Sequence, residues 1–169
     1  GMDKEAVDAI FAKMEKSVDP KGVAKNIKTQ VTKAEIVMPA QKMKMSVVVS
    51  EKFPNKQRTD MVIPDVMNLV LVCNGKNAWE FSTLSGLREI KDKELVSMQL
   101  EMLISNPQNS MRDVFKDIKI EDKTIKVDEF DCLKMTCISK NDTLEPIIMY
   151  VDNKEYFVRK VEKVIHSSQ

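Results

Sequence analysis

The fold is decided by residues 67–82, which read MNLVLVCNGKNAWEFS. Apolar side chains fill every second position of the first half, at Met67, Leu69, Leu71 and Cys73. Because successive side chains on a strand point to opposite faces, this pattern predicts a strand with one apolar row and one mostly more polar row. Asn74-Gly75 is a strong hairpin signal, and residues 78–82 are the expected returning strand.

The same alternation extends outward from this hairpin. Upstream, Met43, Met45, Val47 and Val49 occupy alternate positions, and Pro64-Asp65 marks another turn. The strands predicted in this half are residues 27–38, 42–51, 57–63, 67–73, 77–82 and 86–90. Since the connections are short, we expect an antiparallel meander, as one wide sheet with an apolar face that needs a cover.

A helix is predicted before this sheet, over residues 4–17. Apolar residues recur there at helical spacing, at Val7, Ile10, Phe11 and Met14, and Asp3 can cap the start. Asp19-Pro20-Lys21-Gly22 ends the pattern.

A second helical pattern begins at Asp92, which is a plausible cap, and ends at Asn106-Pro107. Its apolar residues cover most of the helix circumference, so we expect contact on more than one side. Ser110 is predicted to cap a third, short helix whose apolar face is Met111, Val114, Phe115 and Ile118.

Strand character then resumes over residues 119–127, 132–139, 144–151 and 156–165. The order is therefore helix, five or six strands, one or two helices, and about four strands. This order predicts a single α+β domain over residues 1–169, with the helices packed on the concave apolar face of a curved antiparallel sheet.

Composition excludes several function classes. The net charge is +1 with 31% charged residues, which argues against a nucleic-acid partner. No apolar run approaches the length of a membrane-spanning helix. Gly1-Met2 is typical of an expression scar, so we expect that a signal peptide was removed upstream.

Catalytic and metal-binding signatures are missing from the sequence. His166 is the only histidine and lies near the end, which argues against histidine metal sites and histidine-dependent triads. With four glycines there is no phosphate-cradling loop, and no pair of catalytic carboxylates stands out among the many acidic residues. We therefore expect no enzyme, no cofactor and no metal.

The three cysteines, Cys73, Cys132 and Cys137, fit no zinc or redox spacing. On one strand, Cys132 and Cys137 lie roughly 17 Å apart at about 3.3 Å per residue, too far for a disulfide. We expect three buried thiols, with a bridge from Cys73 to one of the others as the alternative.

The apolar surface is the stronger functional lead. Twelve methionines are many for this length, and methionine both fills irregular cores and lines adaptable binding surfaces. For any single methionine, a position in an ordinary core is the favoured explanation. Together they suggest a hydrophobic cavity between sheet and helices that accepts acyl chains, with Trp79 and Phe81 on one wall and Glu80 turned toward solvent. The predicted ligand-binding residues are Met43, Met45, Met61, Leu69, Leu71, Trp79, Phe81, Met98 and Met102.

Several strings also resemble a known family. They are residues 37–44 (VMPAQKMK), 53–56 (FPNK), 61–64 (MVIP) and 74–80 (NGKNAWE). The last combines a strand ending in Asn-Gly, a short turn and a strand carrying Ala-Trp. Together these strings are similar to the outer-membrane lipoprotein-sorting superfamily, the LolA/LolB-like proteins.

This resemblance implies an open half-barrel sheet with a helical lid, here residues 92–118, over a hydrophobic cavity. It implies non-catalytic binding or transport of lipid or lipoprotein acyl chains, in the periplasm or in association with the outer membrane. An envelope protein partner and peripheral membrane contact are compatible with that role. The family holds its lid with an arginine, for which Arg58 and Arg88 are the candidates by location.

Two other function classes stay open. One is a protein-interaction or envelope-sensing module with a filled core and no lipid ligand. The other is an enzyme, which two close carboxylates in a cleft would favour.

Overall fold

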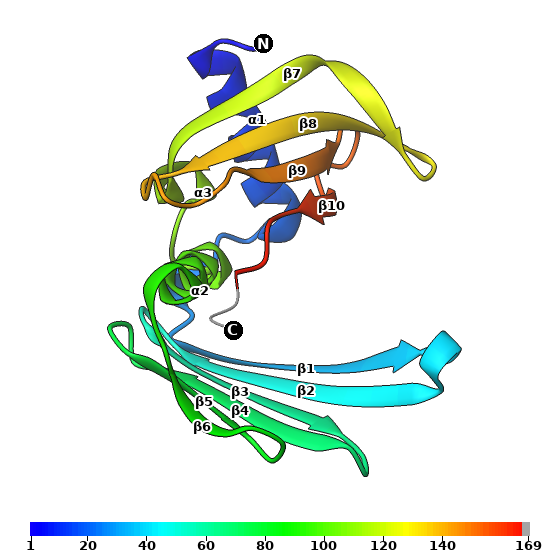
Figure 1. Cartoon of the computed structure of the whole chain (residues 1–169). Helices are drawn as coiled ribbons and strands as arrows, with labels where there is room; N and C mark the ends of the chain where they lie inside the picture. Colours follow the sequence, from blue (N-terminus) through cyan, green and yellow to red (C-terminus); the bar gives the residue numbers. More distant parts are fainter. Residues whose placement is uncertain (167–169) are drawn as a thin grey trace. The chain divides into compact units, whose positions relative to one another are not determined.

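Two antiparallel sheets carry the strands of the computed structural model, which describes residues 1–166 (Figure 1). The first has six strands in the order β1-β2-β3-β4-β5-β6, and the second has four in the order β10-β9-β8-β7. The six are β1 Thr29–Met38, β2 Met43–Lys52, β3 Lys56–Ile63, β4 Met67–Cys73, β5 Ala78–Ser82 and β6 Gly86–Ile90. The four are β7 Phe115–Val127, β8 Phe130–Ser139, β9 Ile147–Asp152 and β10 Val158–Glu162.

Along the chain, α1 comes before the first sheet, and α2 and α3 come between the first sheet and the second. They are α1 Lys4–Val18, α2 Asp92–Ser105 and α3 Met111–Val114, with short 3-10 turns at Ala24–Asn26 and Pro39–Gln41. The α+β class, the N-terminal helix and the antiparallel pairing are confirmed. The wide antiparallel meander predicted for residues 27–90 is confirmed as the six-stranded sheet. One curved sheet for the whole chain is wrong, because the chain leaves the first sheet after β6 and β7 pairs with β8 in a new meander.

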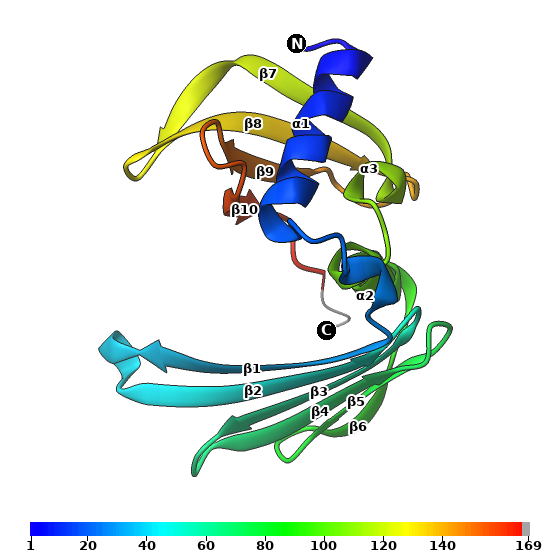
Figure 2. The same cartoon turned by 180° about the vertical axis from the view of Figure 1, so that it is seen from behind.

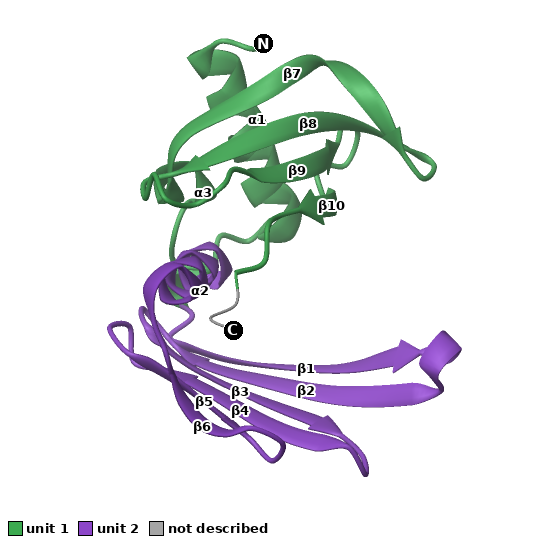
Figure 3. Cartoon of the chain, viewed as in Figure 1, with its two compact units in different colours: residues 1–26, 107–166 green, residues 27–106, 167–169 purple. Residues whose placement is uncertain are grey.

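The chain divides into two compact units, which Figure 3 colours separately. Unit 1 comprises residues 1–26 and 107–166. The described part of unit 2 is residues 27–106. That the chain acts as one domain over residues 1–169 stays a prediction.

In unit 1, α1 lies across one face of the four-stranded sheet (Figure 2). Asp3 Oδ1 accepts a hydrogen bond from the Ala6 backbone N–H at 2.9 Å, as an N-cap should. The apolar stripe of α1 is buried: Val7, Ile10, Phe11 and Met14. So is the facing strand row: Ile118, Ile120, Leu133, Met135, Cys137, Ile147, Met149 and Val151. This core is filled by residues from both layers.

The predicted third helix is shorter than expected. It stops at Val114, and Phe115 begins β7 with extended backbone angles. A register shift between Phe115 and Asp117 lets both Phe115 and Ile118 be buried from one strand. A bulged strand thus reproduces the three-residue spacing that predicted a helix. Ser110 makes no capping bond and instead donates from Oγ to Glu15 Oε1 at 2.8 Å.

Other boundaries move by a few residues. β4 and β6 keep the predicted bounds. β9 begins at Ile147, so Pro146 lies outside the strand, and β10 ends at Glu162 rather than at residue 165. Lys91 occupies the N-cap position of α2 and Asp92 lies in its first turn.

Candidate functional site

Strand register assigns the side chains of the six-stranded sheet to two faces. Directly paired residues project to the same face. One row across the sheet is Glu51, Gln57, Cys73, Ala78 and Ile90, and the next is Val49, Thr59, Leu71, Glu80 and Arg88. Residues of these rows contact α2, so we call this the helix-side face and the other the opposite face.

The beginning of α2 is attached through Arg88 on β6. Its guanidinium donates to both carboxylate oxygens of Glu94 on α2, at 2.8 and 2.9 Å, and from Nε to Glu80 Oε1 on β5 at 2.9 Å. The hydrogen bonds to Glu94 and then Glu80 raise the pKa of Arg88 above its usual value. A bidentate arginine–carboxylate pair fixes orientation as well as distance. Arg88 therefore sets where α2 starts on the sheet.

The middle and end of α2 are held by single hydrogen bonds. Gln99 Nε2 donates to the Gly75 carbonyl oxygen at 2.9 Å. Ser105 Oγ donates to Glu51 Oε1 at 2.8 Å, and Gln57 Nε2 donates to the same oxygen at 3.1 Å. Glu51 is buried, so these partners satisfy a carboxylate that would otherwise be costly there.

Gly75 is required by the turn that receives Gln99. Its φ is +95°, and an added Cβ would lie 2.7 Å from Asn55 Nδ2 and 2.8 Å from Asn55 Cβ. Asn74 Oδ1 accepts the backbone N–H groups of Lys76 and Asn77 at 3.0 and 2.9 Å. The Asn-Gly signal thus marks a loop whose conformation also positions α2.

A small apolar cluster lies beneath the helix. Cys73, Ala78, Ile90 and Met102 form its buried part, and the partly buried side chains packed against it are Leu71, Leu95 and Met98. These strand residues come from the end of β4, the start of β5 and the end of β6. The cluster therefore places α2 over that end of the strands.

The helix-side face continues along the strands as a strip of half-buried apolar residues. Leu69 pairs with Met61, and Met61 pairs with Val47. We name Met43, Met45, Met61, Met67 and Leu69 the methionine strip; all five are half-buried. Unbranched thioether side chains on such a surface can adapt to an irregular apolar ligand.

The structure brings most of the predicted ligand residues to this side of the sheet. Met43, Met45, Met61, Leu69 and Leu71 lie on the helix-side face, and Met98 and Met102 of α2 pack at its edge. None of these placements tests ligand binding, which stays a prediction for all of them.

Trp79 and Phe81 do not share that wall. They pair with Val72 and Val70 and so lie on the opposite face, where they are 38% and 48% exposed. Glu80, expected toward solvent, is instead the residue of β5 that faces Arg88 and α2. The alternation along β5 was predicted correctly, but its two faces were assigned the wrong way round. Trp79 and Phe81, the most apolar side chains of this strand, point away from α2.

Of the two arginine candidates, only Arg88 contacts α2 among the described residues. Arg58 lies on the opposite face and pairs with Asp60 of its own strand, with both nitrogen–oxygen distances at 2.8 Å. No sequence pattern marks Glu51, Gln99 or Ser105 as residues that hold α2, since each acts through a contact that forms only in the folded chain.

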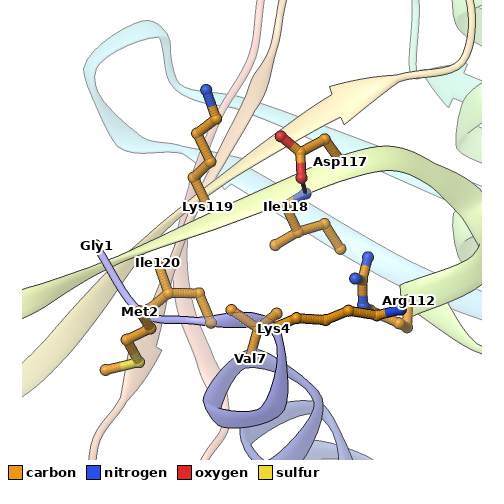
Figure 4. Close-up of a pocket in the computed structure, with 9 residues that line it drawn as sticks. All are labelled: Gly1, Met2, Lys4, Val7, Arg112, Asp117, Ile118, Lys119 and Ile120. Atoms are coloured by element: carbon orange, nitrogen blue, oxygen red, sulfur yellow. Dashed lines mark hydrogen bonds between the residues drawn. The ribbon is translucent and has the colours of Figure 1, made fainter.

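Unit 1 contains a pocket of about 400 Å³ beside the start of α1 (Figure 4). It is lined by Gly1, Met2, Lys4, Val7, Arg112, Asp117, Ile118, Lys119 and Ile120. Two of its charged groups already have hydrogen-bond partners: Arg112 Nε donates to Asp8 Oδ1 at 2.7 Å, and Asp117 Oδ1 accepts the Ile118 N–H at 2.9 Å. It is therefore a weaker candidate than the helix-side face.

The cysteines and the histidine show ordinary structural roles. Cys73, Cys132 and Cys137 are buried and free, and burial raises the pKa of Cys137 to about 12. His166 Nε2 lies 2.6 Å from Glu145 Oε2. Within residues 1–166 no cluster of His, Cys, Asp and Glu is arranged to hold a metal ion, and no helix is long and apolar enough to span a membrane.

Comparisons with known proteins find similarity in structure but none in sequence. No protein-family model matches the chain, and no curated protein matches it by sequence. Among solved structures, it is similar to a crystal structure from Vibrio parahaemolyticus described as a putative outer membrane lipoprotein-sorting protein domain. The TM-score is 0.50 at 14% identity, covering 90% of this chain and 72% of the other. At this identity the likeness supports the fold, in agreement with the resemblance seen in the sequence.

Proposed function

We propose that the helix-side face of unit 2 binds the acyl chain of a lipid or lipoprotein without catalysing a reaction. The observation that carries the proposal is the methionine strip, a half-buried apolar surface that continues beyond the cluster under α2. The similarity in fold to a lipoprotein-sorting domain supports the same ligand class. A role in the bacterial cell envelope, in the periplasm or at the outer membrane, is part of this proposal.

The proposed ligand contacts are Met43, Met45, Met61, Leu69 and Leu71 on the sheet and Met98 and Met102 on α2. Each methylene removed from water contributes roughly 0.8 kcal/mol, so chain length should control affinity. Because the contacts are apolar and flexible, the site should accept different tails of similar length. Trp79 and Phe81 are left out of the set because they lie on the opposite face.

The test is a titration with a fatty acid that carries an environment-sensitive fluorophore. Met61→Glu places a carboxylate within the strip, and we expect it to abolish binding. Phe81→Glu makes a comparable change on the opposite face of the same sheet, and binding should persist. Circular dichroism and thermal unfolding of both variants check that the fold is retained.

Equal binding by both variants would show that the strip is not the site. A folded wild-type protein that binds no fatty acid, and carries no co-purified lipid in native mass spectrometry, would instead favour the interaction module with a filled core.

A further inference from the structure

β1 is an edge strand of the six-stranded sheet, and its properties differ from those of the other sheet edges. It is ten residues long and pairs with β2 through ten consecutive positions without a register shift. The opposite edge, β6, has five residues. In the other sheet, β7 contains two register shifts and β10 has five residues with one shift.

Proteins usually protect open edges with short strands, bulges, prolines or unpaired charges. Short strands or bulges are found at β6, β7 and β10, whereas β1 is long, regular and free of proline. Most of it is exposed, including Val31 at 62% and Val37 at 54%. Apart from the charges of Lys33 and Glu35, β1 therefore lacks these protective devices, and its edge is open to another strand.

The sequence of β1, TQVTKAEIVM, is complementary to itself when two copies run antiparallel with Ala34 opposite Ala34. Lys33 of each copy then faces Glu35 of the other, so two opposite-charge pairs form. Val31 faces Val37 on the same side of the sheet, and Thr32 faces Ile36 on the other side. A shift of one residue loses both charge pairs, because it places Lys33 opposite Ala34.

We propose that β1 is the interface of a homodimer, in which two copies pair antiparallel about a two-fold axis at Ala34. A two-fold axis requires antiparallel strands and makes every contact occur twice. The six-stranded sheets would then continue across the dimer. This proposal does not depend on lipid binding, since the charge pairs lie on the face opposite the methionine strip.

The charges also define the test. Lys33→Glu sets two carboxylates against each other at both pairs, and Glu35→Lys does the same with two ammonium groups. Opposed like charges on paired strands are destabilising, and two such pairs should weaken the dimer by about tenfold or more. The double variant K33E/E35K exchanges the charges and should restore dimerisation. Glu35 now pairs with Lys44 at 3.4 Å, but both side chains are well exposed, so Lys44 can turn to solvent.

Sedimentation equilibrium over the micromolar range measures the dissociation constant of each protein. Lys119→Glu makes the same charge change on β7, the edge of the other sheet, and should leave the constant unchanged. The Phe53 N–H donates to the Lys28 carbonyl, so by alternation the odd-numbered backbone N–H groups of β1 point away from β2, toward the open edge. Val31→Pro removes one of these donors and should weaken the dimer in either charge background. A wild-type protein that stays monomeric throughout, or a dimer that the single charge reversals and V31P leave unaltered, overturns the proposal.

Discussion

The two units combine the same parts with different results. Each packs one long helix against an antiparallel sheet. In unit 1 the fifteen-residue α1 faces four strands, and the apolar row of that sheet is buried at Ile120, Met135 and Val151. In unit 2 the fourteen-residue α2 packs on six strands, and the methionine strip is only half-buried.

The difference lies in how much sheet one helix can cover. An α-helix advances 1.5 Å per residue and is about 10 Å wide, while neighbouring strands are about 4.8 Å apart. One helix can therefore seal a narrow sheet, but a six-stranded sheet needs more cover. We interpret unit 1 as a closed scaffold and the helix-side face of unit 2 as the surface available to a ligand.

The largest expected contrast comes from methionines at matched strand positions in the two units. Met135→Ala empties a site with no exposed surface and should lower the free energy of unfolding by about 2–5 kcal/mol. Met61→Ala, in the half-buried strip, should cost less than about 1.5 kcal/mol because its neighbours are less completely packed. Urea denaturation measures both. Equal losses would show that the two sheets are sealed to the same degree.

Glycines with positive φ give the next contrast. Gly75→Ala combines a strained φ with a contact against Asn55 and should cost about 2–3 kcal/mol. Gly22→Ala, in unit 1, has φ +66° and open space around it, so about 1 kcal/mol is expected. Thermal unfolding compares the two variants. A harmless G75A would mean that the loop receiving Gln99 is not constrained.

Arginine variants test what holds α2 on its sheet. Arg88→Gln removes the bonds to Glu80 and Glu94 and should cost about 1–2 kcal/mol, a value reduced for screening because a third of the side chain is exposed. Amide hydrogen exchange in α2 should also accelerate. Arg58→Gln is the control on the opposite face and should change neither quantity. If α2 exchanges no faster in R88Q, the helix is held by its apolar contacts alone.

The smallest effect is a pH dependence located in unit 1. Asp152 accepts hydrogen bonds from Arg159 Nη2 and the Lys154 N–H, both at 2.8 Å, and these lower its pKa. Its contribution to stability is therefore complete above its unfolded pKa, about 3.9, and is lost as pH falls through the lower folded value. Thermal unfolding of wild type and Asp152→Asn should differ at neutral pH and converge in strong acid. A constant difference at all pH values would contradict this.

Local patterns were sufficient to predict most elements. β4 and β6 follow from period-two alternation bounded by turn residues, and α1 follows from its apolar stripe and the Asp3 cap. The start of β7 could not be distinguished from a helix, because a bulge creates the same spacing at Phe115 and Ile118. The break into two sheets had no local signal either, since it depends on which strands β7 meets.

The candidate site was predictable only in part. The methionine strip follows from alternation, because each member repeats the period of its own strand. The orientation of β5 does not, since Trp79 and Phe81 are the more apolar side chains and yet lie on the opposite face. Glu80 is turned inward by Arg88, a partner on the next strand that itself binds α2. The face of the sheet on which a side chain lies depends on such non-local contacts, and the sequence of a single strand does not reveal them.

The most direct test of ligand binding at the strip uses the methionine methyl groups as probes in both units. A titration with an unlabelled fatty acid is followed by ¹³C-methyl NMR of the twelve methionines, assigned by substitution. We predict that the resonances of Met43, Met45, Met61 and Met98 shift with chain length, while those of Met14, Met135 and Met149 in unit 1 do not. Shifts confined to unit 1, or none at saturating ligand, would contradict the assignment of the methionine strip as the acyl-chain site.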